Sequence, residues 1–290
     1  MLGKWYNLPS TCVSQCEFST LMTISIVTAC FNCAATLQTA LNSVAAQEGA
    51  TIDYIVVDGA STDGTVEMLE AFQKSLAASS RGDISFRFIS ERDEGMYDAI
   101  NKGIGMARGE FVGILNADDY LDGDDVIARV ASFLENRKSA SLDCVFGNVR
   151  FVRELGGKTH RVCFARFWRP WMLQWGYMPP HPAIFIRKTR FADWGGYVPS
   201  RAEYRIAADY ELLIRFFCRN RMSHRYIPVC TTVMRTGGVS TRDVDARRRL
   251  NSEIIKGNRA NGYFCCWPML LPKYLIKIWE VILPRLGLLK

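Results

Sequence analysis

"FVGILNADDY" (residues 111–120) sets an apolar run directly before two adjacent carboxylates, Asp118 and Asp119. An apolar run of this length, bounded by polar residues, is typical of a buried strand. Two acids side by side need a reason to stand at the end of such a strand, because like charges repel. The stretch therefore predicts a strand that ends at a polar site.

The segments around this strand alternate between short β-branched runs and helix-period runs. Such alternation predicts an α/β fold with a mainly parallel central sheet, right-handed crossovers and helices on both faces. Ligands of such sheets bind beyond the carboxyl ends of the strands. The expected strands are residues 24–28, 52–58, 84–90, 110–116 and 143–149, and the expected helices are residues 34–47, 65–78, 96–107 and 124–137.

Composition limits the class of protein. A chain of 290 residues with 49% hydrophobic content can bury a sizeable core. Its ten cysteines are too scattered for a disulfide scaffold, and no secretion signal is recognisable, so the expected location is a reducing cytoplasm. No window reaches the roughly 18 uninterrupted apolar residues that a membrane-spanning helix requires. We therefore expect no membrane-spanning segment.

Acidic and basic residues are sorted along the chain. Residues 1–149 hold 10 Lys and Arg against 20 Asp and Glu, whereas residues 150–235 hold 16 against 5 and residues 236–290 hold 10 against 4. The acidic half suits a divalent cation, and the basic half suits phosphate-bearing ligands or an anionic membrane surface. Ordinary solvated faces of differing sign are the alternative. No nucleic-acid partner is expected, because no aromatic platform accompanies the basic run 246–250.

Polar side chains follow three of the expected strands at their carboxyl ends. Asp58 closes the second strand, Asp93 follows the third, and Asn116, Asp118 and Asp119 close the fourth. Clustered carboxylates raise one another's pKa unless a cation lies between them, so we expect a bound Mg²⁺ or Mn²⁺. Simple helix capping by these acids is the alternative.

The loop after the first strand, "ACFNCAAT" (29–36), holds neither a G-x-G-x-x-G fingerprint nor a lysine-bearing phosphate loop. Its sequence argues against a dinucleotide dehydrogenase and a P-loop NTPase, and leaves metal-bridged diphosphate binding. A nucleotidyltransferase is a further possibility, although its usual glycine-rich, lysine-bearing start is missing.

Several motifs together resemble bacterial family 2 glycosyltransferases, most closely the enzymes that build exopolysaccharide, capsule or O-antigen, including colanic-acid-like polymers. The resemblance covers residues 22–240. It rests on "SIVTACFN" (25–32), "VVDGASTDGT" (56–65), "ERDEGMYDAINKGI" (91–104) and "GILNADDYL" (113–121) in the donor half, and on "PPHPAIFIRK" (179–188) and "IAADYELLIRF" (206–216) on the acceptor side.

The resemblance implies a GT-A fold and an order of segments. Residues 22–150 would form the nucleotide-sugar half and residues 151–240 the acceptor half. Outside the resemblance, residues 1–21 show no clear period and are expected to be an N-terminal extension. The composition of residues 241–290 predicts a basic, helical segment that either associates with a membrane or packs on the core.

The resemblance also implies roles on the donor side. It puts Thr28 and Asp58 at the nucleobase, and Asp93 and Lys102 beside the nucleotide and its phosphates.

Asn116 stands where the family often has the first acid of its Asp-x-Asp motif, near the ribose, and Asp118 stands at the metal with Asp119 beside it. Here the chain departs from the pattern, because Asn116 brings no charge.

On the acceptor side, the resemblance implies an inverting transfer from a nucleotide-diphosphate sugar to a lipid-linked saccharide. Asp209, at an expected helix start, would be the general base that deprotonates the acceptor hydroxyl. His181 would contact the acceptor or the diphosphate, although Pro182 replaces the Gln that often follows it. The enzyme would work in the cytoplasm, peripherally on the inner face of the cell membrane. A noncatalytic nucleotide-sugar-binding or scaffold subunit of a polysaccharide assembly is the alternative.

Cysteines and the C-terminal stretch allow other interpretations. Cys12, Cys16, Cys30 and Cys33 have spacings that a zinc site uses, and the last two also match a redox motif. Their place in the expected base-binding loop argues against both. Residues 263–290 mix aromatics and leucines with basic residues, which is typical of an interfacial helix. A helix packed on the protein's own core is equally compatible with this pattern.

Overall fold

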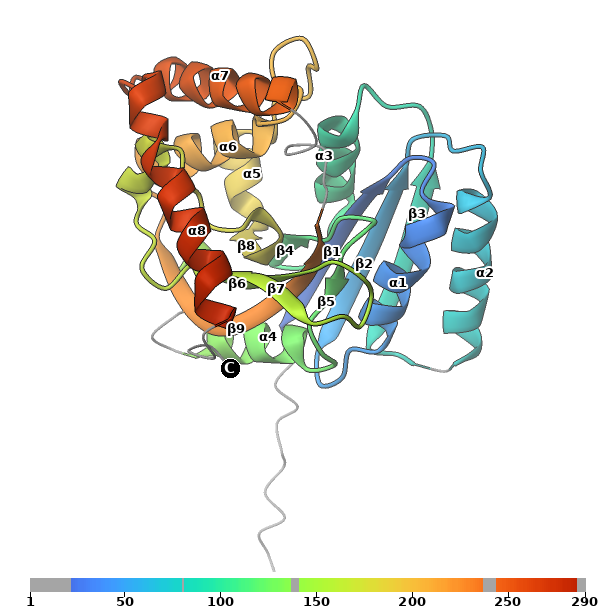
Figure 1. Ribbon diagram of the computed structural model, residues 1–290. Coiled ribbons are helices and arrows are strands. Elements are labelled where there is room, and N and C mark those ends of the chain that lie inside the picture. The colour runs from blue at the N-terminus through green and yellow to red at the C-terminus, as the bar shows by residue number, and fades with distance from the viewer. Residues whose placement is uncertain (1–21, 80, 137–140, 237–243, 286–290) are drawn as a thin grey trace, which may run out of the picture.

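The computed structural model describes residues 22–79, 81–136, 141–236 and 244–285, so the N-terminal extension predicted for residues 1–21 lies outside the described residues. One curled, nine-stranded sheet runs through the molecule in the order β3-β2-β1-β4-β8-β6-β9-β5, with β7 beside β6 (Figure 1). The strands are β1 (Thr23–Cys30), β2 (Thr51–Asp58), β3 (Ile84–Ser90), β4 (Phe111–Ile114), β5 (Tyr120–Leu121), β6 (Cys144–Val152), β7 (Thr159–Cys163), β8 (Ile184–Arg187) and β9 (His224–Arg235).

The sheet is mixed but mostly parallel, which confirms the predicted fold class. β1, β2, β3 and β4 are parallel, and β6 pairs with β9 in parallel. β8 runs against both β4 and β6, so it joins the part of the sheet that holds β1 to β4 to the part that holds β6 and β9. β5 and β7 are also antiparallel to their partners.

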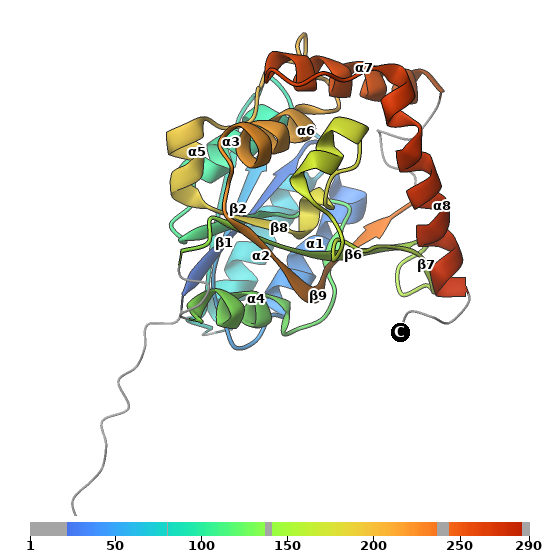
Figure 2. The same ribbon diagram turned by 90° about the vertical axis from the view of Figure 1, so that its left-hand side faces the viewer.

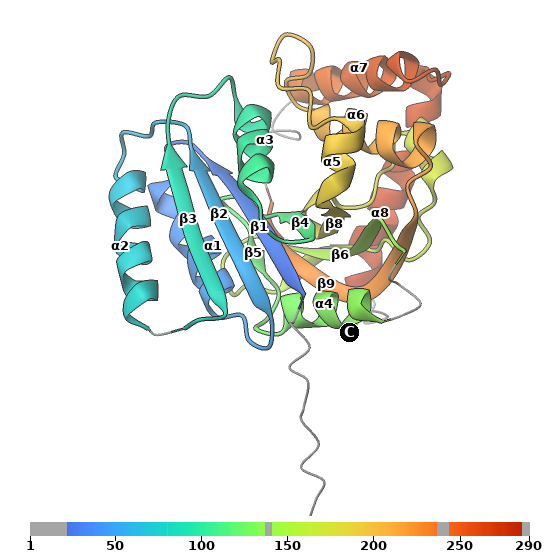
Figure 3. The ribbon, with the colours of Figure 1, turned by 180° about the vertical axis from the view of Figure 1, so that it is seen from behind.

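Helices cover both faces of the sheet (Figure 3). The α-helices are α1 (Ala34–Ala45), α2 (Thr65–Ala78), α3 (Met96–Met106), α4 (Val126–Glu135), α5 (Lys188–Trp194), α6 (Ala208–Leu213), α7 (Val244–Ala260) and α8 (Pro272–Arg285). The other helical segments are η2 (Pro170–Trp175), η3 (His181–Ala183), η6 (Trp267–Leu270) and the π-helical η4 (Ile214–Arg219).

Two hydrophobic cores lie on opposite faces of the sheet. Ile55 and Val57 of β2 pack in the core that contains residues of α3, α5, α6 and α7, whereas Tyr54 and Val56 pack in the core that contains residues of α1, α2 and α4. Successive side chains of a strand point to opposite faces, so a strand buried on both faces is apolar at most positions. Each fully buried aliphatic side chain contributes about 1.5–3 kcal/mol to folding.

One aspartate joins the starts of α1 and α2. Asp63 accepts hydrogen bonds from the backbone N–H of Ala34 (3.0 Å) and from that of Thr65 (3.1 Å). A carboxylate at a helix N-terminus satisfies N–H groups that have no partner in the helix and complements the helix dipole. Asp63 thereby holds the loop after β1 against the loop after β2, at the carboxyl edge of the sheet.

The C-terminal segment is helical, as predicted. α7 and α8 meet at a steep angle, α7 lies over α6, and α8 packs along β7 (Figure 1). Within the described ranges, no helix combines the length and the apolar composition needed to cross a membrane.

Candidate active site

The loops after β1 and β2 form the donor edge of the site. The backbone N–H of Asn32 donates to Ser61 Oγ (2.8 Å), and Asn32 Oδ1 accepts from the backbone N–H of Thr62 (2.9 Å). Asn32 has φ +49°, a left-handed conformation that asparagine tolerates better than most residues. These bonds fix the two loops together at the ends of the parallel strands.

An exposed aromatic ring stands on this edge, and sequence reasoning missed it. Phe31 keeps 63% of its side chain exposed. A Cβ atom on Gly59 would lie 3.3 Å from the Phe31 ring and 2.7 Å from Asp93 Oδ2, so both side chains approach Gly59 closely. Phe31 and Asp93 therefore border the same small surface. The signal in the sequence was a large aromatic residue directly after a strand.

Thr28 and Asp58 lie beneath this surface. Both are fully buried. The Asp58 carboxylate accepts from Ser90 Oγ (2.7 Å) and from the backbone N–H of Ser61 (2.9 Å), and Thr28 Oγ1 lies 3.3 Å from the Tyr54 hydroxyl. Their contact with a nucleobase stays a prediction. Their present partners make them supports of the two loops.

Lys102 lies within α3 and contacts the turn before this helix, which carries Asp93. Lys102 Nζ pairs with Glu91 Oε1 at 2.8 Å and with Asp98 Oδ2 at 3.4 Å, and it donates to the carbonyl of Arg92. Asp93 Oδ1 accepts from the backbone N–H of Gly95 at 2.7 Å. Lys102 therefore closes the turn that carries Asp93, and its contact with phosphate stays a prediction.

The paired acids that follow β4 have different environments. Asp118 is exposed, whereas Asp119 is buried and accepts from Asn116 Nδ2 at 2.7 Å. Burial raises the pKa of Asp119 to about 7, and the charge of Asp118 adds to the effect. Asp118 is thus the carboxylate available to a cation. Metal binding by either residue stays a prediction, and the burial of Asp119 favours Asp118.

Arg235, which sequence reasoning also missed, approaches these acids from the end of β9. Tyr120 pairs with Val233, and the backbone N–H of Arg235 donates to Asp119. The Nε and Nη2 atoms of Arg235 are buried and have no hydrogen-bond partner in the described part of the chain. Unsatisfied buried donors are costly, and a guanidinium suits phosphate. Arg235 is therefore a candidate anion contact near Asp119.

The residues present are compatible with a divalent cation held largely by its substrate. Across the described ranges, no group of three or more His, Cys, Asp or Glu residues is arranged to hold a metal ion by itself. Mg²⁺ at a nucleotide needs only one or two carboxylates, because phosphate oxygens and water fill the remaining positions. One exposed carboxylate, Asp118, meets that requirement.

The second centre of the site surrounds Asp209 in the first turn of α6. Asp209 Oδ1 accepts from the backbone N–H of Tyr210 (2.7 Å) and lies 3.4 Å from the Tyr97 hydroxyl. Burial raises the pKa of Asp209 to about 6. Such a carboxylate is ionised at neutral pH, yet it is basic enough to accept a proton during a reaction.

A row of rings connects Asp209 with His181. The His181 Nε2 atom lies 2.7 Å from the Tyr197 hydroxyl, and the Tyr197 ring stacks on the Tyr97 ring at 5.6 Å between centroids. The side-chain amide of Asn101 in α3 makes two hydrogen bonds of 2.8 Å to the backbone of Tyr197. Burial lowers the pKa of His181 to about 4, so the imidazole is neutral at physiological pH. The two predicted acceptor-side residues therefore belong to one connected cluster.

Glu253 of α7 holds the segment that leads to Asp209. Its carboxylate accepts from the backbone N–H groups of Arg205 (3.1 Å), Ile206 (2.8 Å) and Ala207 (2.9 Å). These N–H groups belong to the segment just before α6, which starts at Ala208. Nothing in the sequence pairs Glu253 with residues nearly 50 positions away, so only the structure reveals this contact.

We expect Glu253→Ala to lower the free energy of unfolding by about 1–3 kcal/mol, because it leaves buried N–H groups without an acceptor. Transfer should fall more than donor affinity, since the affected segment carries Asp209. Thermal unfolding, calorimetry and a transfer assay check these outcomes. The matched control is Glu203→Ala, at an exposed acid in the same region. Equal unfolding of both variants would show that Glu253 is not an anchor.

A curled, mostly parallel sheet with an acidic carboxyl edge is the architecture of GT-A nucleotide-sugar enzymes. The chain belongs to glycosyltransferase family 2, since the family model described as "Glycosyl transferase family 2" matches residues 25–193. The specific exopolysaccharide or capsule type suggested by the motifs is a finer assignment than this match supports.

Relatives with known names support the same family. The chain is 31% identical over 227 residues to a "PGL/p-HBAD biosynthesis glycosyltransferase" of Mycobacterium bovis, with 76% of this chain and 80% of the relative covered. It is 31% identical over 140 residues to "Succinoglycan biosynthesis protein ExoO" of Rhizobium meliloti, with 48% of this chain and 36% of the relative covered.

Solved structures share the fold. Residues 1–349 of S. aureus TarS in complex with UDP-GlcNAc match with a TM-score of 0.60 at 18% identity, over 81% of this chain and 67% of that one. A mannosyltransferase from Pyrobaculum calidifontis in complex with GDP-Man and Mn²⁺ matches with a TM-score of 0.56 at 18% identity, over 86% of this chain and 67% of that one.

Proposed function

We propose that the chain transfers a sugar, with inversion at the anomeric carbon, from a nucleoside-diphosphate sugar to a lipid-linked saccharide during cell-surface polysaccharide synthesis. Residues 22–150 serve as the donor half and residues 151–240 as the acceptor half. The reaction takes place in the cytoplasm, at the inner face of the cell membrane. The proposal rests mainly on Asp209, because burial raises the pKa of its carboxyl to about 6 and the chain belongs to family 2.

On the donor side, Phe31 stacks on the base and Asp93 contacts the nucleotide, while Asp118 would hold a divalent cation that would offset the negative charge of the diphosphate. Support comes from the exposure of Phe31 and Asp118. Arg235 contacts the diphosphate through its unpartnered buried donors. Structures of the same fold carry UDP-GlcNAc, or GDP-Man with Mn²⁺, which supports a nucleotide-sugar donor and a divalent cation.

Four of the predicted donor-side residues act in support of these contacts. Their polar groups are engaged with neighbouring loops, which they hold in place. They are Thr28 and Asp58 beneath the base, Lys102 at the turn that carries Asp93, and Asn116 beside Asp119.

In the reaction, an acceptor hydroxyl attacks the anomeric carbon while its proton passes to a carboxylate oxygen of Asp209. The new bond joins the acceptor oxygen to this carbon as the bond from the same carbon to the phosphate oxygen breaks. The nucleoside diphosphate leaves with that electron pair. The divalent cation, when bound, neutralises the negative charge that grows on the diphosphate.

Neutral His181 orients the acceptor or the diphosphate through hydrogen bonds. Tyr97 and Tyr197 hold His181 in position relative to Asp209. The names of two relatives, one in PGL/p-HBAD biosynthesis and one in succinoglycan biosynthesis, support a glycan or glycolipid product.

A noncatalytic sugar-nucleotide-binding subunit is the second candidate. Asn116 favours it, because the residue has no charge where the family often has an acid. The two candidates differ in turnover: an enzyme hydrolyses its donor slowly without acceptor, whereas a scaffold subunit binds the donor and leaves it intact.

The deciding experiment is a screen of UDP, GDP and dTDP sugars with Mn²⁺ by thermal stabilisation and donor hydrolysis. We expect one nucleotide class to raise the melting temperature only with the metal, and its sugar to be released slowly. Stabilisation without any hydrolysis would favour the scaffold subunit. No stabilisation by any donor would reject both candidates.

Phe31→Ala should weaken donor binding by about 1–3 kcal/mol, the usual contribution of base stacking on an aromatic ring. Calorimetry with the donor and Mn²⁺ checks this expectation. Phe31→Tyr is the control, because it keeps the aromatic face and should bind as the wild type does. If Phe31→Ala also binds as the wild type, the base does not stack on this ring.

A further inference from the structure

The C-terminal helix α8 has its polar and apolar sides reversed relative to an ordinary surface helix. Lys273 and Glu280 are buried, at 3% and 5% exposure, whereas Leu275 and Trp279 are 64% and 59% exposed. Exposed apolar residues recur along α8 at the spacing of one helix face. This surface faces away from the protein, so it contributes nothing to the core.

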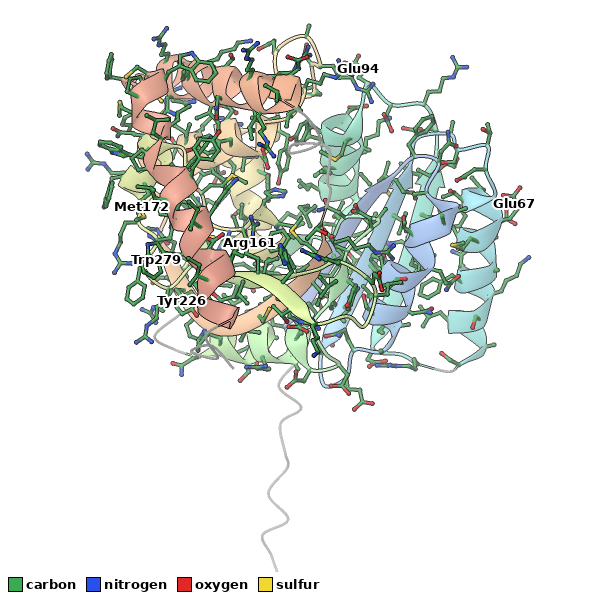
Figure 4. All side chains as sticks on the ribbon, in the orientation of Figure 1. Glu67, Glu94, Arg161, Met172, Tyr226 and Trp279 are labelled. Atoms are coloured by element: carbon green, nitrogen blue, oxygen red, sulfur yellow. The ribbon has the colours of Figure 1, made fainter. Side chains whose placement is uncertain are left out.

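Buried polar contacts explain why the helix packs in this orientation. Lys273 Nζ donates to Asn251 Oδ1 (2.5 Å), and Glu280 Oε1 accepts from the Tyr177 hydroxyl (2.9 Å). Burial lowers the pKa of Lys273 to about 8. In Figure 4 Arg161, which pairs with Glu280, lies on the inner side of α8, whereas Trp279 lies on the outer side with Met172. The outward position of the apolar residues is therefore fixed by specific contacts.

The apolar surface continues from α8 onto η6 and η2, on the side of the molecule that Figure 2 turns toward the viewer. Cys265 Sγ donates to the carbonyl of Gln174, and a Cβ atom on Gly176 would lie 2.7 Å from Leu270, so the three helices are closely joined. We define the outer apolar face by six side chains that are 40–64% exposed: Trp171, Trp175, Trp267, Leu275, Ile278 and Trp279.

A groove opens on this face between η2 and α8. Its volume is about 320 Å³ and its accessible lining is apolar, with Trp171, Trp175 and Ile276 among the residues that form it. A groove without polar lining offers no hydrogen bonds to a sugar or a peptide backbone, and it suits a hydrocarbon chain.

The charges on the same segments are complementary to an anionic lipid surface. Across residues 164–180 and 254–282, the strongly exposed charged side chains are all basic, and the single acid, Glu280, is buried. They include Arg166 and Arg169 next to Trp171. Tryptophans with basic neighbours are typical of surfaces that lie in the membrane interface.

The outer apolar face is connected through η2 to the helix that carries Asp209, the candidate general base. Tyr210, the residue after Asp209, donates a hydrogen bond from its hydroxyl to the carbonyl of Leu173 in η2. A lipid held at η2 would therefore lie next to the helix that carries Asp209.

We propose that the outer apolar face docks the protein on a bilayer containing anionic lipid, that its groove takes a lipid chain, and that docking brings lipid-linked acceptors to Asp209. The acceptor part rests on the proposed function. The docking part stands on the face itself.

Binding to vesicles of phosphatidylcholine, with and without phosphatidylglycerol, tests the docking. Wild-type protein should bind the anionic vesicles, and its binding should weaken as salt rises. Replacing two inserted side chains in Leu275→Ser/Trp279→Ser should reduce binding roughly 100-fold. The matched control is Val244→Ser, at a residue as exposed as Leu275 (64%) but outside the face.

Melting temperatures and donor calorimetry separate this inference from the proposed function. Both variants should match the wild type in each, because neither position touches the core or the donor edge. Vesicle binding without donor binding would reject the proposed function and keep the docking face. Donor binding with no vesicle binding, or equal vesicle binding by wild type and double variant, would overturn the docking. A wild-type dimer that the double variant dissociates would instead assign the face to a second copy of the chain, and would likewise overturn it.

Discussion

Asp209→Asn is expected to reduce sugar transfer by about 100-fold to 10,000-fold while donor affinity stays close to that of the wild type. The substitution keeps the size of the side chain and removes its ability to accept a proton. Asparagine caps a helix about as well as aspartate, so a purely structural role predicts normal transfer. Transfer is measured with a labelled lipid-linked acceptor and donor affinity by calorimetry.

The pH dependence gives a second readout of the same prediction. Burial raises the pKa of Asp209 to about 6, so wild-type transfer should rise with pH through about 6 and level off above it. Because the folded-state pKa lies above the ordinary value, ionisation of Asp209 costs stability as pH rises through about 6. Asp209→Asn should therefore be at least as stable as the wild type at pH 7. Near-wild-type transfer, or an unchanged pH profile, would remove Asp209 from the reaction.

Asp118→Ala is expected to abolish metal-dependent donor binding. An exposed carboxylate that binds a divalent cation supplies both a charge and a ligand. Its removal should weaken metal-dependent donor binding by more than the 10- to 100-fold that is typical for residues that contact a metal ligand rather than the metal. Asn116→Ala removes only a neutral hydrogen bond to Asp119, so its effect should be smaller. Calorimetry with donor and Mn²⁺, or with donor and a chelator, measures both.

Asp119→Asn serves as the control for these two variants. It keeps the size of the side chain, and the carboxylate of Asp119 is buried and therefore not exposed to a cation. Equal losses for Asp118→Ala and Asn116→Ala would contradict the assignment of the cation to Asp118.

The part of the fold that carries β1 to β4 could be predicted from the sequence because β1, β2 and β4 are buried on both faces and helices alternate with the strands. α2 and β3 have the predicted bounds, residues 65–78 and 84–90. β8 breaks the parallel order, and four residues between two antiparallel neighbours carry no local signal of their direction. The π-helical turn η4 likewise departs from ordinary helix periodicity.

The candidate site was predictable where residue type and strand end coincide, and unpredictable where distant segments meet. Asp118 follows the predicted strand and Asp209 stands at the predicted helix start, but the ring stack from Tyr97 to Tyr197 spans 100 residues. The roles of Arg235 and Glu253 depend on contacts across β9 and α7. Likewise, burial separates Asp119 from Asp118, although the two are adjacent in the sequence.

The sequence of α8 was compatible with an interfacial helix and with a helix packed on the core. The structure combines features of both, because Lys273 and Glu280 face the protein while Leu275 and Trp279 face outward. Hydrophobic periodicity distinguishes the polar side of a helix from its apolar side. It does not indicate which side the fold covers when buried partners such as Asn251 and Tyr177 satisfy the polar side.

Proton NMR of the anomeric signals during turnover tests the central claim most directly. The wild-type enzyme is incubated with the donor selected by the screen, a membrane lipid extract as acceptor, and either Mn²⁺ or a chelator. We predict that the donor signal decays only with Mn²⁺, that the new glycosidic signal has the opposite anomeric configuration, and that Asp209→Asn does not produce it. A product that retains the donor's configuration, or turnover that persists with the chelator, would contradict a metal-dependent single displacement with Asp209 as the base.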